Sequence, residues 1–300
     1  MRARVNGVGF TTVELMVAFV LAGIVMAAIG AVLRRQQRFY TNAASLVEQR
    51  VALRDVTGML PGELRALSPA GGDVMAFSDS ALDLRATIGA AIACDTVPGG
   101  GAIALAPASG RVSLASFTTA PQAGDVALVY DGGASDRADD DAWISLSVVD
   151  VASSPALCVG SPFAPIGDAF SPPLILRFGA GSRVPPSVGP GAFVRLLRRV
   201  RYRFYRASTG DWYVGYSEWN ATGFTVVQPV SGPFAAYSSR GASGVALRYF
   251  DENGAELLDP GDAARITRVR VAARGAARGT LSGTRAVTDS QAVGVRVRNR

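Results

Sequence analysis

Residues 10–33 read FTTVELMVAFVLAGIVMAAIGAVL, a run in which Glu14 is the only charged residue. At about 1.5 Å of rise per residue, a helix of this length can cross a hydrocarbon layer about 30 Å thick. A secretory signal peptide is the first alternative, because Arg2 and Arg4 precede the run and small residues occur near 27–31. The run is longer than the roughly 7–15 apolar residues of a signal peptide, and a carboxylate costs about 2.5–3.5 kcal/mol at mid-bilayer. We therefore expect a transmembrane helix at 10–33.

Residues 9–15, GFTTVEL, resemble the N-terminal processing motif of type IV pilins and of the pseudopilins of type II secretion. In that family a membrane-embedded peptidase cleaves after the glycine that matches Gly9 and methylates the new terminal amine, here that of Phe10. The resemblance implies a leader peptide at 1–9. It also implies that the new ammonium group pairs with Glu14 of a neighbouring subunit, so that two groups costly alone in lipid neutralise each other. Glu14 is then an assembly residue, and the simpler alternative is an incidental charge in a signal-anchor helix.

The charges beside the apolar run do not fix its orientation, since Arg2 and Arg4 on one side oppose Arg34, Arg35 and Arg38 on the other. A cytoplasmic N-terminus, insertion in the cytoplasmic membrane and a head outside the cytoplasm are therefore what the resemblance implies.

The helix is expected to continue beyond the membrane, because no proline occurs between Phe10 and Met59. Apolar side chains recur at helical spacing over 34–60 and oppose polar ones, which predicts an amphipathic continuation that packs on a sheet. These apolar residues are Phe39, Tyr40, Ala43, Ala44, Leu46, Val47, Val51, Leu53 and Leu60.

Residues 61–300 are expected to form a globular head of mainly antiparallel β structure, which with the long helix gives an α+β fold. The segment 71–124 is weakly patterned and predicts loops and irregular short strands. Short alternating or apolar runs predict strands at 126–130, 143–151, 174–178, 194–206, 212–216, 224–228, 245–250, 266–272 and 293–298. Several of these β patterns resemble J-type minor pseudopilins and PilW-like minor pilins, namely 199–205, 212–219, 241–254 (GASGVALRYFDENG) and 293–299 (VGVRVRN).

The composition excludes most enzyme machinery, because the chain has no histidine and all of its basic residues are arginine. Without histidine there is no Ser-His-Asp triad and no HExxH zinc site, and without lysine there is no Schiff-base amine and no Walker-A lysine. We expect a protein that is not an enzyme and that needs no cofactor.

An aspartate-rich segment supplies hard oxygen ligands and is the one metal candidate, for calcium. Its spacing does not match the DxDxDG pattern, so a solvated turn between two strands is the alternative, and a carboxylate pair of a hydrolase is a third interpretation. The residues are Asp131, Asp136, Asp139, Asp140 and Asp141.

The net charge of +6 and the pI near 9.8 indicate either an anionic partner or a base-composition effect on codons. Arg199, Arg201 and Arg203 alternate with apolar residues, which places one cationic and one apolar face on a single strand. The cationic face is interpreted either as a phosphate-binding stripe for DNA or as an ordinary outward sheet face. The chain has two cysteines, Cys94 and Cys158, which form either one disulfide or two unpaired thiols, and a head outside the cytoplasm favours the disulfide.

Together these features predict a minor pilin or pseudopilin at or near the tip of a type IV pilus or of a type II secretion pseudopilus. Its expected partners are the prepilin peptidase, other pilins or pseudopilins, and the cytoplasmic membrane. The alternative is a membrane-anchored, DNA-binding pilus subunit for DNA uptake.

Overall fold

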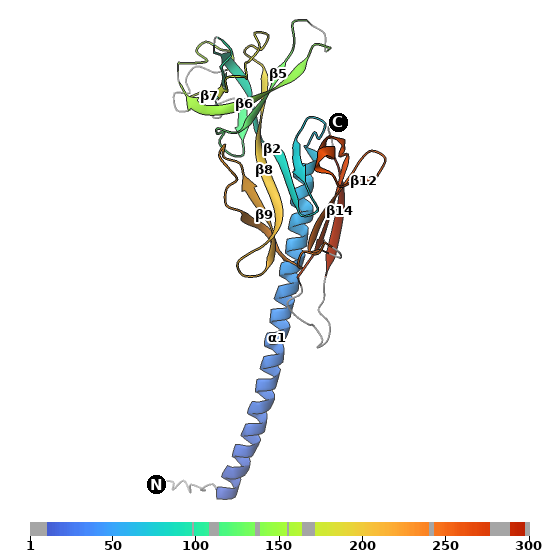
Figure 1. Cartoon of the computed structure of the whole chain (residues 1–300). Helices are drawn as coiled ribbons and strands as arrows, with labels where there is room; N and C mark the ends of the chain where they lie inside the picture. Colours follow the sequence, from blue (N-terminus) through green and yellow to red (C-terminus); the bar gives the residue numbers. More distant parts are fainter. Residues whose placement is uncertain are drawn as a thin grey trace, which may run out of the picture.

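The computed structural model of the chain describes residues 11–97, 99–107, 114–135, 139–154, 156–163, 172–239, 243–276 and 289–297. A single long helix, α1 (Thr12–Arg65), projects from a β-rich head (Figure 1). The helix begins at the N-cap residue Thr11 and passes through Pro61, which lies buried in its last turns. The predicted α+β fold, a long N-terminal helix on a mainly antiparallel β head, is confirmed.

The C-terminal part of α1 lies between two sheets and shares one hydrophobic core with both of them. Its buried apolar residues recur at helical spacing. The buried helix residues are Gln49, Ala52, Leu53, Val56, Leu60, Pro61 and Leu64. The packing expected for the 34–60 segment buries residues fully only from Gln49 onward. Before it, Phe39, Tyr40 and Val47 lie exposed, whereas Ala43 and Leu46 are half-buried.

The larger sheet contains the long strands β2 (Ala81–Thr96) and β8 (Phe193–Arg206), which pair with each other in antiparallel fashion. Its other strands are β1 (Val74–Phe77), β3 (Ala102–Leu105), β4 (Ala115–Phe117), β5 (Val126–Asp131), β6 (Ala142–Ser153), β7 (Leu174–Phe178), β9 (Trp212–Glu218) and β10 (Gln228–Phe234).

Six of these strands close into a small barrel, in which β2 pairs with β3, then β7, β6, β5 and β8 follow, and β8 returns to β2. Inward side chains such as Ile103, Val129 and Leu176 fill the barrel. The barrel lies at the end of the head farthest from the projecting end of α1 (Figure 1).

A second sheet of order β12-β11-β13-β14 covers the other side of α1 (Figure 1). It consists of β11 (Val245–Phe250), β12 (Glu256–Leu257), β13 (Arg268–Arg274) and β14 (Ser290–Arg296), with the 3-10 helix η1 (Pro260–Arg265) between β12 and β13. Alternate residues of these strands, among them Leu247, Val269 and Val295, join the core around the helix.

Two strand predictions were wrong in part. The segment 71–124 contains the expected short strands, β1, β3 and β4, but it also contains β2, whose 16 residues make it the longest strand described. The strand predicted at 224–228 instead begins at Gln228 and runs to Phe234 through two prolines. Prolines are tolerated there because β10 lies at the edge of its sheet.

Arg198 on β8 forms the most buried charge network that the described residues contain. Its guanidinium donates to both carboxylate oxygens of Asp125, at 2.8 and 2.9 Å, and to Glu218 at 2.9 Å. It also donates to the Thr119 hydroxyl and the Ala120 carbonyl. Every N–H of the guanidinium therefore has a partner, and the hydrogen bonds to Asp125 raise the pKa of Arg198 further above its ordinary value.

We expect Arg198→Met to destabilise the head by about 3–5 kcal/mol, because it leaves the Asp125 carboxylate buried without a charge partner. The double variant Arg198→Met/Asp125→Leu should recover a measurable part of that loss, since it removes both charges. Denaturant unfolding of the two single variants and the double variant measures the coupling. Strictly additive losses would contradict a buried pair.

Candidate functional site

The N-terminal part of α1 is the most prominent functional feature, since it is apolar and the head does not cover it. The helix is long and apolar enough to span a membrane, with a mean hydropathy of 2.7 in its most apolar window and none of that window buried. Large apolar side chains point outward all round it, for example Leu15, Phe19 and Ile24. A helix that is apolar on every side is suited to lipid or to other apolar helices rather than to water.

Glu14 lies in the first turn of this helix and forms a capping box with Thr11. One carboxylate oxygen of Glu14 accepts from the Thr11 backbone N–H and from the Thr11 hydroxyl, each at 3.0 Å. The Glu14 N–H in turn donates to the Thr11 hydroxyl at 3.2 Å. Within the described residues no cationic group pairs with Glu14. Gly9 and Phe10, the residues predicted for processing, lie outside the described residues.

The aspartate-rich segment connects β5 with β6, and its carboxylates bind backbone and hydroxyl donors. Asp131 accepts from the Gly133 N–H and the Ser187 hydroxyl, and Asp140 accepts from the Ala134 and Ser135 N–H groups.

Hydrogen bonding from the Ser135 hydroxyl, and then from backbone N–H groups, lowers the pKa of Asp140. Asp141 accepts from the Tyr130 hydroxyl, which raises the pKa of Tyr130, and Asp139 is exposed. Asp136 lies outside the described residues. Among the residues described, no group of three or more acidic or cysteine side chains could hold a metal ion.

The alternating segment of β8 has the two faces that the sequence predicted, since Val200, Tyr202 and Phe204 are buried in the core. On the other face, Arg201 donates to both oxygens of Asp83, at 2.6 and 2.7 Å, and Arg199 donates to Asp83 at 3.1 Å.

Aromatic rings cover these two guanidiniums from outside. Arg199 lies 5.0 Å from the ring centres of Trp219 and Phe224, and Arg201 lies 4.0 Å from that of Phe224. The stripe proposed for phosphate is therefore largely occupied by contacts within the chain.

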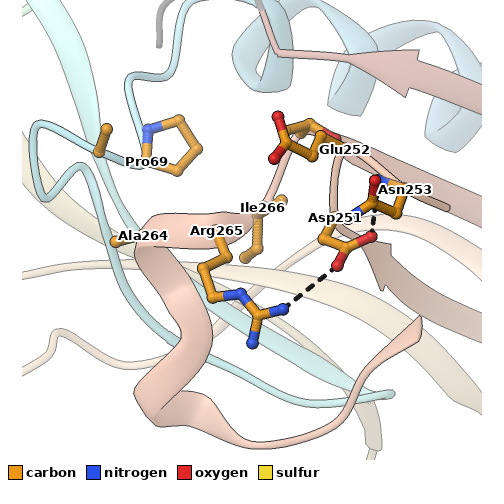
Figure 2. A pocket seen from close by; sticks show the side chains of 9 residues that line it. Pro69, Asp251, Glu252, Asn253, Ala264, Arg265 and Ile266 are labelled. Carbon is orange, nitrogen blue, oxygen red and sulfur yellow. Dashed lines mark hydrogen bonds and ion pairs between the residues drawn. The ribbon is translucent and has the colours of Figure 1, made fainter. Parts of the chain in front are cut away.

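A cleft of about 280 Å³ lies between the segment after α1, the β11–β12 turn and η1 (Figure 2). The Asp251 carboxylate in it accepts from the Asn253 and Ala255 N–H groups at 2.9 Å and from Arg265 at 3.2 Å. Figure 2 shows Arg265 directed at Asp251 rather than into open space. Asp251 and Arg265 therefore stabilise the β11–β12 turn and η1. Neither side chain is free to act on a ligand in the cleft.

Cys94 and Cys158, which are 64 positions apart in sequence, form a disulfide with their Cα atoms 5.3 Å apart. Both cysteines are buried and contact a small apolar cluster that includes Ala104 and Ala106. Of the two alternatives for these cysteines, the disulfide is thus the one observed. It fastens the segment after β6 to the barrel.

Two features escaped sequence reasoning. The first is the neutralisation of Arg198 by Glu218 and Asp125, which are 20 and 73 positions away in the sequence. No local sequence pattern indicates such a pairing. The second feature is an arginine-rich outer face on the C-terminal sheet, and the alternation of Arg268 and Arg270 with Val269 and Val271 could have indicated it.

Comparison with known proteins gives no match, whether with family models, curated proteins or solved structures.

We expect reduction of the disulfide to lower the free energy of unfolding of the head by about 2–4 kcal/mol, because a closed loop of this length restricts the unfolded chain. Thermal unfolding with and without reductant measures the effect. A Cys94→Ala/Cys158→Ala variant should melt identically in both conditions. Two freely reactive thiols under denaturing, non-reducing conditions would contradict the bridge.

Proposed function

We propose that this protein is a minor pilin or pseudopilin, a structural subunit that assembles at or near the tip of a type IV pilus or of a type II secretion pseudopilus. The observation that carries the proposal is the part of α1 from Thr12 to Leu33, which is apolar and uncovered and in which Glu14 is the only charged residue. The resemblance of residues 9–15 to the pilin processing motif supports it.

The lengths along the helix fit a membrane-anchored subunit. The 22 residues from Thr12 to Leu33 rise roughly 33 Å, which matches a hydrocarbon layer of about 30 Å. A further stretch of roughly 24 Å reaches the first fully buried residue, Gln49. Phe39, Tyr40 and Val47 lie exposed along that stretch, and helices of neighbouring subunits in a filament would bury them.

Glu14 acts in this proposal as the acceptor of a positive charge. Its capping hydrogen bonds with Thr11 do not neutralise it, so the carboxylate remains costly in lipid until a cation approaches. A methylated ammonium group on Phe10 of a neighbouring subunit is such a cation, and cleavage after Gly9 creates it. Pairing of the two groups would favour docking of each subunit into the filament.

Processing is tested by intact-mass analysis of the membrane-extracted protein. We expect loss of residues 1–9 and addition of one methyl group at Phe10, because Gly9 and Phe10 occupy the positions of the cleavage motif. A mature N-terminus near residue 31 would instead indicate an ordinary signal peptide and would overturn the proposal.

Assembly is tested with Glu14→Ala and Glu14→Gln, which both remove the charge. We expect at least a tenfold loss of incorporation into filaments, measured by quantifying the subunit in sheared filament fractions. Membrane insertion should be no worse than that of the wild type, because a carboxylate in lipid is itself unfavourable.

The matched control is Glu48→Ala, which removes an exposed carboxylate from the same helix beyond the expected membrane segment. It should assemble normally. Wild-type incorporation of both Glu14 variants would rule out the assembly role.

A further inference from the structure

The outer face of the C-terminal sheet carries five arginines, which we call the arginine face: Arg248, Arg268, Arg270, Arg274 and Arg296. Alternate residues of β13 point away from the helix core, so that Val269 and Val271 are buried while Arg268 and Arg270 are exposed. The register places Arg248 directly opposite Arg270, and Arg268 directly opposite Arg296. Like charges in directly opposed positions destabilise a sheet. These two opposed arginine pairs are therefore unfavourable in the isolated chain.

Among the residues that the structure describes, few groups neutralise these guanidiniums. Arg248 approaches Glu256 at 3.8 Å, and this is the one ion pair that the face forms within the described residues. Arg268 stacks on Phe250, with 4.6 Å between the guanidinium carbon and the ring centre. Arg270, Arg274 and Arg296 form no side-chain hydrogen bond or ion pair within that same set of residues. On β8, by contrast, Asp125 neutralises Arg198, and Asp83 neutralises Arg199 and Arg201.

The face is also hollowed. A depression of about 620 Å³ lies over it, floored by small residues such as Ala246, Ala272 and Ala292 and bordered by Arg248, Arg270 and Arg274. Ser243 and Ser290 add hydroxyl groups at its rim. Arginine and serine side chains are among the groups that contact phosphate oxygens in nucleic-acid complexes.

From this arrangement we infer that the arginine face binds the phosphate backbone of double-stranded DNA without reading its sequence. The aromatic ring that β11, β13 and β14 direct outward is that of Phe250, and Arg268 covers it, so it is not available for base stacking. This favours a duplex over a single strand. The same shortage of exposed aromatic anchors disfavours a protein partner.

Lipid head groups are out of reach of the arginine face if residues 10–33 span the membrane, a step that rests on the proposed function. The end of β14 nearest those residues lies beside the middle of α1, because Asp289 pairs with Arg50 at 3.7 Å and Gln291 contacts the Thr57 hydroxyl at 3.1 Å. Arg50 is 17 residues beyond Leu33, which corresponds to roughly 25 Å of helix.

The test measures binding of the full-length chain, in a neutral detergent, to fluorescent 20-base-pair duplexes of two unrelated sequences. With about four phosphates contacted, the affinity should fall roughly a hundredfold between 50 and 200 mM salt and should be equal for both sequences. Arg270→Ala/Arg296→Ala should weaken binding at least tenfold at low salt and reduce the salt slope by about two. The Arg270→Lys/Arg296→Lys variant should retain most of the affinity, because it keeps both charges.

Two controls separate binding from folding and from total charge. Arg65→Ala/Arg183→Ala removes the same charge from exposed positions outside the face and should bind like the wild type. The melting temperature of Arg270→Ala/Arg296→Ala should not fall, because the substitutions relieve two like-charge pairs.

Three results would overturn the inference. One is no binding to either duplex at 50 mM salt, and another is equal loss of binding in the control variant. The third is stronger binding of polyglutamate of matched charge, which would assign the face to an acidic protein. None of these results bears on processing at Gly9 or on the assembly role of Glu14.

Discussion

The pairing of β2 with β8 is the constraint on which the rest of the head depends, because these two strands contribute to both hydrophobic cores. Their register runs from Ala81 opposite Arg203 to Ile92 opposite Phe193. Near one end, Leu84 and Val200 pack against α1, and near the other end residues such as Leu196 fill the barrel. A slip of one residue would turn the side chains of a strand to the opposite face in both cores at once.

A bulge in β2 allows one strand to serve two cores. The register shifts between Thr87 and Gly89. Inward residues of β2 are therefore even-numbered up to Ile88 and odd-numbered from Ala91 onward. Gly89 is required there, because a Cβ atom would lie 2.3 Å from the Ser116 carbonyl oxygen of the neighbouring strand.

The sequence predicted those elements whose local pattern agrees with their final environment. The helix α1 and the strand β8 were predicted because apolar periodicity is strong in both, and β11 was predicted with its observed bounds. The strand β2 was missed because alanine, glycine and aspartate make up much of it, and these residues favour strands poorly without a long partner. The candidate processing and assembly residues depend on a short local motif and could be named from sequence. Which carboxylate neutralises which arginine depends on register between distant strands and could not.

Register also decides where the positive charge of the protein is available. On β8, Arg198 is buried with Asp125 and Glu218, while Arg199 and Arg201 share Asp83. These arginines stabilise the joint between the barrel and the helix core and have little charge left for a partner. On β13 the same alternation of arginine with valine meets a sheet that offers only Glu256. Two similar sequence patterns therefore have opposite consequences, since the neighbouring strand either supplies carboxylates or adds more arginine. The positive charge of the C-terminal sheet is thus less neutralised by carboxylates than that of Arg198, Arg199 and Arg201 on β8.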